Sequence, residues 1–388
     1  MAERHPVVTF ASRTAYRALR GAKLSLDAAI GALRSRASKG ARRQIAIKNA
    51  EIVALRSELA RVRGEEPPPD PASTPAFFAV GYQKSGTTWL MRMLDSHPEI
   101  LCKGEGRFFG AGWRQESVRR IDDRRPPSSL HNAVLDAEYL KLWIERSVWS
   151  RNDDAEEHLT NLIRMSIDYF LTGELSKTSK RLVGDKSPLL TDTVLEEIAG
   201  IYPEAKVIHI IRDGRDAAIS AVHHSWNFGR AGKNAETTAK REAYRRDQRE
   251  LRGAGESIFA GNSLSKLAKE WSDRVDKNVK DGQSLLGSNY SEVRYEDLLE
   301  KPEEELRRLL NYLGAEASEE IVRRCVSAAS FEKLSKGRKK GEEDPSSFFR
   351  KGVAGDWRNT FTEEDRRVFK EVAGDLLIKL GYEKDRDW

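Results

Sequence analysis

A short apolar run that leads into a glycine-bounded turn and then a helical pattern constrains the fold of this chain most. Residues 77–80, Phe-Phe-Ala-Val, predict a strand that is covered on both faces of a sheet. Gly81 and Gly86 bound the turn, where glycine lets the backbone bend sharply and approach a ligand closely. Apolar residues at 90, 91 and 94 predict a helix that stops near Pro98. Such a strand–loop–helix unit indicates an α/β fold with an anion site, because unpaired N–H groups and the helix dipole point at the loop.

The loop differs from the P-loop of nucleotide-triphosphate enzymes, which has Gly-Lys-Ser/Thr at the start of the helix. Here Gly86 is followed by Thr87, and Lys84 precedes the glycine by two residues. The lysine is therefore expected beside the anion. Residues 84–89, Lys-Ser-Gly-Thr-Thr-Trp, resemble the 5′-phosphosulfate loop of the sulfotransferases that use 3′-phosphoadenosine 5′-phosphosulfate (PAPS). The alternative is a core strand and turn that happen to contain a lysine.

Two segments resemble parts of the sulfotransferases that modify glycans. Residues 105–109 match the pattern Glu-x-x-Phe-Phe, and the resemblance makes Glu105 the general base that removes the acceptor proton. The alternative is a surface glutamate ahead of two core phenylalanines. Residues 185–188, Asp-Lys-Ser-Pro, resemble the segment in which a second lysine lies near the sulfuryl group or the acceptor. This resemblance gives Lys186 a catalytic role, and Asp185 remains a rival for the base.

A third apolar strand, predicted over residues 205–211, ends at Arg212, and Asp213 is placed to cap the helix that follows. In sulfotransferases this arrangement binds the 3′-phosphate of PAPS through the arginine and a serine on the helix, here Ser220. Arginine suits that role because its guanidinium can donate two hydrogen bonds to one phosphate. His209, inside the apolar strand, is expected to be a core residue.

The segment 348–359 places two cations next to glycine in a loop without helical or strand periodicity, which suits phosphate binding by side chains and backbone together. It resembles the Arg-Lys-Gly…Gly-Asp-Trp segment of cytosolic sulfotransferases, which closes on the 3′-phosphate. The Lys-Thr-His segment of many cytosolic members is absent from the sequence, which favours Glu105 as the base. Residues 225–265, rich in Gly, Asn, Ser and charges, are expected to form a mobile insertion over the acceptor.

These motifs follow the order of the sulfotransferase family, and the resemblance implies a three-layer α/β/α fold with a central parallel sheet. It also implies in-line transfer of a sulfuryl group from PAPS to a hydroxyl or amine of a carbohydrate, a glycolipid or a small alcohol or phenol. The alternatives are a P-loop kinase or NTPase and a non-catalytic coiled-coil scaffold. No metal is expected, because no His or carboxylate cluster has ligand spacing. The implied PAPS contacts are Gly81, Lys84, Ser85, Gly86, Thr87, Thr88, Trp89, Arg212, Ser220, Tyr295, Phe349, Arg350, Lys351 and Gly352.

The sequence divides into a basic helical arm (1–63), a Pro-rich linker (64–74) and the sulfotransferase domain (75–388). The arm dominates the charge: residues 1–50 carry +9 and the rest −3, so no nucleic-acid partner is expected. Residues 44–63 read either as a short parallel coiled coil that would form a homodimer or as a lone surface helix. Residues 1–43 read as a peripheral membrane contact, a solvated helix or an organelle transit peptide.

A cytoplasmic protein is expected from the absence of an apolar signal region and of a spanning apolar run. Two cysteines exclude a disulfide scaffold and fit a reducing compartment.

Overall fold

The computed structural model describes residues 76–110, 155–189, 191–228 and 235–388. The predicted basic arm, its coiled coil, the membrane contact and the Pro-rich linker lie outside these residues. No helix in the described ranges is both long enough and apolar enough to cross a membrane.

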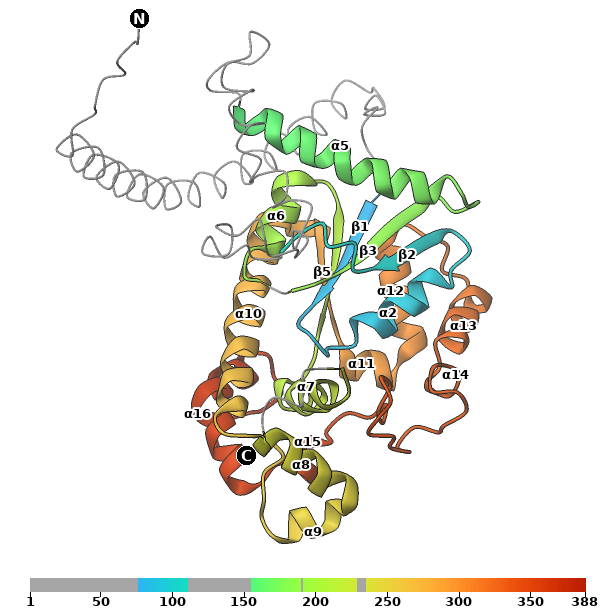
Figure 1. Ribbon diagram of the computed structural model, residues 1–388. Coiled ribbons are helices and arrows are strands. Elements are labelled where there is room, and N and C mark those ends of the chain that lie inside the picture. Colours follow the sequence, from blue (N-terminus) through green and yellow to red (C-terminus); the bar gives the residue numbers. More distant parts are fainter. Residues whose placement is uncertain (1–75, 111–154, 190, 229–234) are drawn as a thin grey trace, which may run out of the picture.

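The described strands form one parallel sheet in the order β2–β3–β1–β4–β5 (Figure 1). The strands are β1 (Ala76–Gly81), β2 (Ile100–Gly104), β3 (Leu182–Pro188), β4 (Lys206–Ile211) and β5 (Tyr290–Arg294). Because all strands are parallel, their carboxyl ends meet at one edge. The chain runs from β1 outward to β2 and later returns to β4 on the other side, so β1 marks the switch point, where open α/β sheets bind ligands.

Helices cover both faces of the sheet, which confirms the predicted three-layer fold. Side chains alternate along β1: Phe78 and Val80 pack with α5 (Ala155–Leu175), α6 (Val194–Ile201) and the end of α10 (Ser263–Leu286). Phe77 and Ala79 face the opposite layer. That layer contains α2 (Thr87–Asp95), α12 (Pro302–Leu313) and α13 (Glu319–Ala328).

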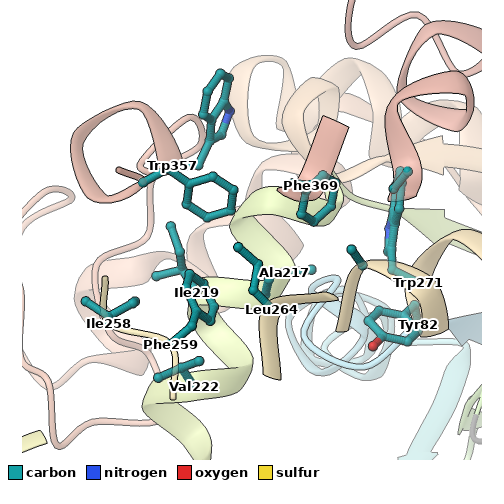
Figure 2. Close-up of a cluster of buried hydrophobic side chains, with 14 of the residues drawn as sticks. Tyr82, Ala217, Ile219, Val222, Ile258, Phe259, Leu264, Trp271, Trp357 and Phe369 are labelled. Carbon is teal, nitrogen blue, oxygen red and sulfur yellow. The ribbon is translucent and has the colours of Figure 1, made fainter. Parts of the chain in front are cut away.

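A third cluster of buried side chains lies toward the carboxyl end of the sheet, where α7 (Gly214–Phe228), α10 and α16 (Glu363–Lys379) meet around Trp271 and Phe369 (Figure 2). The segment expected as a mobile insertion contributes to this core. Within it α7 runs on to Phe228, and α8 (Ala235–Arg246) and α9 (Gln248–Gly253) follow. Tyr244 and Phe259 are buried in the cluster. The segment is therefore packed against the core, although its own sequence contains few apolar residues.

The remaining elements connect these layers. They are the short helix η2 (Gly287–Asn289), α11 (Tyr295–Glu300), α14 (Phe331–Leu334) and α15 (Trp357–Thr360). Residues 295–297, Tyr-Glu-Asp, form the first turn of α11. His209 is fully buried, and its Nδ1 lies 2.6 Å from the Tyr290 hydroxyl, so it is a core residue as expected.

Candidate active site

A cleft of about 530 Å³ opens at the carboxyl edge of the sheet and takes residues from the end of each of the five strands. The structure brings most of the predicted site residues together in its lining: Lys84, Gly86, Thr87, Thr88, Trp89, Glu105, Lys186, Arg212, Ser220, Tyr295, Phe349, Arg350, Lys351 and Gly352. Gly81 and Ser85 lie outside the lining. A Cβ atom on Gly81 would lie 2.7 Å from the Ile210 carbonyl oxygen, so this glycine allows close strand packing.

The lysine loop joins β1 to α2 through a tight turn. The Ser85 N–H donates to the Tyr82 carbonyl, and Gly86 adopts a left-handed conformation with φ of 94°. A Cβ atom at Gly86 would lie 2.5 Å from the Tyr295 ring, so only glycine lets that aromatic ring lie against the loop. Thr87 and Thr88 begin α2 and present its unpaired N–H groups to the cleft.

Lys84 follows the central strand β1 and lines the cleft, and its backbone is also left-handed (φ 66°). Its ammonium group lies 4.4 Å from the centroid of the Phe348 ring. Burial, together with the positive charges of Arg212 and Lys186, lowers the pKa of Lys84 to about 8. This lysine is therefore held where its positive charge is not fully compensated, and a bound anion would stabilise it.

Arg212 leaves the end of β4 and links three parts of the site. Its Nη1 donates to the Lys84 carbonyl at 3.0 Å, and its guanidinium stacks 4.3 Å from the centroid of Tyr295. Its Nε is buried and has no hydrogen-bond partner among the described residues. An unpaired buried donor costs about 1–3 kcal/mol, so this atom is suited to a ligand oxygen.

The Arg350–Lys351 pair is fixed by two carboxylates that sequence reasoning did not single out. Arg350 donates to Glu343 at 2.7 Å and to Asp356 at 2.6 Å, and Lys351 donates to the other oxygen of Asp356 at 2.6 Å. These contacts lower the pKa of Asp356 against the effect of its burial. The cations therefore face the cleft in fixed positions before any ligand binds.

Two further residues hold this loop, and the sequence analysis missed both. Arg338 donates to the carbonyl oxygens of Phe349 and Arg350, at 2.6 and 2.8 Å. Asp216 on α7 accepts from the N–H groups of Gly355 and Trp357, at 2.6 and 2.9 Å. The only available sequence clue is that Asp216 lies one helical turn after Arg212.

At the other end of the cleft, Glu105 follows β2 and pairs with Lys186 at the end of β3. Lys186 lowers the pKa of Glu105, so this carboxyl is ionised at neutral pH. Asp185 does not contact a lysine within hydrogen-bond distance in the described residues. It is buried and accepts from the Gly106 N–H at 2.9 Å and from the Ser187 hydroxyl at 2.6 Å.

Comparison with known proteins gives consistent results. The family model described as the sulfotransferase domain matches residues 74–381. The nodulation protein NoeE of Sinorhizobium fredii (strain NBRC 101917 / NGR234) is 25% identical over 309 residues, which cover 79% of this chain and 66% of that protein, just under two thirds of its length. A putative protein-tyrosine sulfotransferase of Caenorhabditis briggsae is 25% identical over 312 residues, 79% of this chain and 88% of that one.

Among solved structures, mouse sulfotransferase SULT7A1 complexed with PAP is similar with a TM-score of 0.43 and 18% identity. The similarity covers 80% of this chain and 86% of that chain.

Proposed function

The chain belongs to the sulfotransferase family, and on that premise we propose that it transfers the sulfuryl group of PAPS to a hydroxyl or amine of an acceptor. One observation supports this most strongly. Lys84, Arg212 and the Arg350–Lys351 pair are far apart in sequence, yet they line a single cleft beside the N-terminus of α2. Two separate groups of cations in one cleft suit a ligand with anions at both ends.

PAPS fits the residues present. The lysine loop and the first N–H groups of α2 would hold the 5′-phosphosulfate. Trp89 and Tyr295, whose rings contact each other edge to face with centroids 5.6 Å apart, would both contact the adenine. The unpaired Nε of Arg212 supports a phosphate oxygen at this position. The proposed 3′-phosphate contacts are Arg212, Ser220, Arg350, Lys351 and Gly352.

The proposed reaction is a direct in-line displacement. The acceptor oxygen forms a bond to sulfur while the bond between sulfur and the bridging oxygen of the 5′-phosphate breaks. The acceptor proton passes to Glu105, and the electron pair of the broken bond stays on the phosphate of the leaving 3′,5′-ADP. Lys84 stabilises the negative charge that builds on that leaving oxygen. Lys186 orients the Glu105 carboxylate and keeps it ionised.

The acceptor class that we propose is a carbohydrate, a glycolipid, or a small alcohol or phenol, since each offers a hydroxyl to an open cleft. The test is transfer of ³⁵S from labelled PAPS into pools of these acceptors. We expect Lys84→Ala and Glu105→Ala each to lose activity by about 10²-fold or more, the range typical of acid–base groups. Lys266→Ala, which removes an exposed cation on α10 outside the cleft lining, is the matched control. Near-normal rates in both site variants would reject the roles assigned here.

The basic arm supports two further proposals that come from sequence alone. Residues 44–63 would form a homodimer through a coiled coil, and residues 1–43 would bind an anionic membrane surface. Comparing the full chain with a chain lacking residues 1–63, by sedimentation and by binding to anionic vesicles, separates these proposals. An unchanged oligomeric state would exclude the coiled-coil dimer, and unchanged vesicle binding would exclude the membrane contact.

A further inference from the structure

The order of the strands separates the two ends of the cleft. Arg212 and Tyr295 follow β4 and β5, Lys84 follows the central β1, and Glu105 and Lys186 follow β2 and β3. Neighbouring strands lie about 4.8 Å apart, so the end of β2 is roughly 14 Å from the end of β4. If PAPS reaches from Arg212 to Lys84, as proposed above, the side of the cleft near β2 is left for the acceptor.

Arg107 lies on that acceptor side, in a backbone conformation that side chains rarely adopt. In the described part of the chain, Lys84, Glu105, Arg107 and Lys336 are the non-glycine residues with positive φ, and the first three line this cleft. Left-handed conformations of this kind cost about 1–3 kcal/mol each and persist where the surroundings fix them. Their concentration here indicates that the short segment after β2 is shaped for a ligand.

Buried contacts fix the segment that carries Arg107. The Glu105 N–H donates to the Lys186 carbonyl at 2.9 Å, and the Gly106 N–H donates to the buried Asp185 carboxylate at 2.9 Å. A Cβ atom on Gly106 would lie 2.4 Å from the Phe108 ring, so glycine is needed between the two strained residues. The backbone on either side of Arg107 is thereby held against β3, while the Arg107 side chain is exposed.

The charges on this side of the cleft do not balance. Glu105 and Lys186 form an ion pair in which each compensates the other. Arg107 lies close enough for its charge to lower the pKa of Glu105, but it forms no ion pair with any described residue. The acceptor side therefore keeps an exposed guanidinium, which can donate two hydrogen bonds to one carboxylate or sulfate group.

We propose that Arg107 is a specificity-determining residue that binds an anionic group on the acceptor, so that the enzyme prefers acidic acceptors over neutral ones. The proposal rests on the proposed sulfotransferase function, and it narrows the acceptor class of the same site.

The test measures binding of matched acceptors to the full chain saturated with 3′,5′-ADP. One pair is methyl β-D-glucuronide and methyl β-D-glucoside, and the other is 4-hydroxyphenylacetate and 4-hydroxyphenethyl alcohol. Each pair differs in one carboxylate. We expect the anion to bind about tenfold more tightly in at least one pair, as for one hydrogen-bonded charge pair. The preference should shrink as salt is added.

Three variants separate the role of Arg107 from a general effect of charge. Arg107→Gln should bring the two affinities to within about twofold, and Arg107→Lys should keep part of the preference, since a lysine retains the charge without the fork. Arg92→Gln removes the same charge from an exposed position on α2 outside the cleft, and it should leave the preference unchanged.

Equal binding of both members in both pairs, tighter binding of the neutral members, or no binding of any of the four would overturn the role of Arg107. A preference that survives in Arg107→Gln would overturn it as well. The affinity for 3′,5′-ADP and the transfer of ³⁵S from PAPS are measured on separate aliquots of the same protein preparations, without prior saturation by 3′,5′-ADP. If the wild-type chain neither binds 3′,5′-ADP nor transfers ³⁵S from PAPS, the proposed function itself is rejected, and the role of Arg107 with it.

Discussion

The low pKa of Lys84 leads to a specific prediction about the binding of 3′,5′-ADP. Burial and the charges of Arg212 and Lys186 hold this pKa at about 8 in the free protein, against an ordinary value of 10.5. A bound phosphate beside the ammonium group would return the pKa toward that ordinary value. Below pH 8 the lysine is protonated in both states, so affinity is constant. Above pH 8 binding must take up a proton, and affinity falls as pH rises.

The size of the effect follows from linkage. With a pKa of 8 in the free protein and 10.5 in the complex, the dissociation constant should rise about 30-fold between pH 7 and pH 9.5. At pH 9 each binding event should take up about 0.9 proton. Titration calorimetry in buffers of different ionisation enthalpy measures both quantities at constant ionic strength.

Two variants assign the effect to one side chain. Lys84→Arg stays protonated throughout this range, so its affinity should not change between pH 7 and pH 9.5. Lys84→Gln should bind more weakly at pH 7 and should also show no pH dependence. The reasoning is refuted if the wild-type protein takes up less than about 0.3 proton at pH 9, or if Lys84→Arg takes up as much.

Three further predictions concern neighbouring parts of the site. Glu105→Gln should lower kcat by about 10²-fold or more while the dissociation constant of 3′,5′-ADP stays the same, and a matching loss of affinity would point to misfolding. Arg212→Ala should weaken 3′,5′-ADP binding by roughly 10- to 100-fold, the size of a hydrogen bond to a charged group, and unchanged affinity by calorimetry would count against this contact. Gly86→Ala places a Cβ atom 2.5 Å from the Tyr295 ring at a φ of 94°, and should lower the free energy of unfolding by about 1–3 kcal/mol in urea titration. Gly173→Ala, in a helix where a Cβ atom would meet nothing within 4 Å, should not destabilise the fold.

Local patterns were enough to predict the elements that carry the site. The buried run before Gly81 and the β-branched run before Arg212 each form the strand that the sequence predicts, because a strand covered on both faces needs a continuous apolar run. The helix Thr87–Asp95 also follows from apolar spacing. In each case the information lies within about twenty residues of sequence.

The contacts that fix the site were not predictable in the same way, because they join residues that are distant in sequence. Asp216 accepts from the backbone of Gly355 and Trp357, and nothing near Asp216 in the sequence reports that contact. Asp356 was part of a motif, but its pairing with both Arg350 and Lys351 depends on how the loop folds back. Arg107 was not predicted as a site residue for the same reason. Its positive φ occurs in a segment that is held by the contact between the Gly106 N–H and Asp185, and these two residues are distant in sequence.

The position of Asp185 bears on which carboxylate acts as the base. Its oxygens accept from a backbone N–H and a hydroxyl, and it lies behind the cleft lining, where burial raises its pKa. A carboxylate held in this way can shape the segment that carries Glu105, but it is poorly placed to meet an acceptor. Glu105 lines the cleft, and the side chain of Lys186 contacts it and keeps it ionised. Asp185→Asn keeps a side-chain oxygen that can accept from the Gly106 N–H. With Glu105 as the base, this variant should retain far more turnover than Glu105→Gln. Equal losses in the two variants would contradict it.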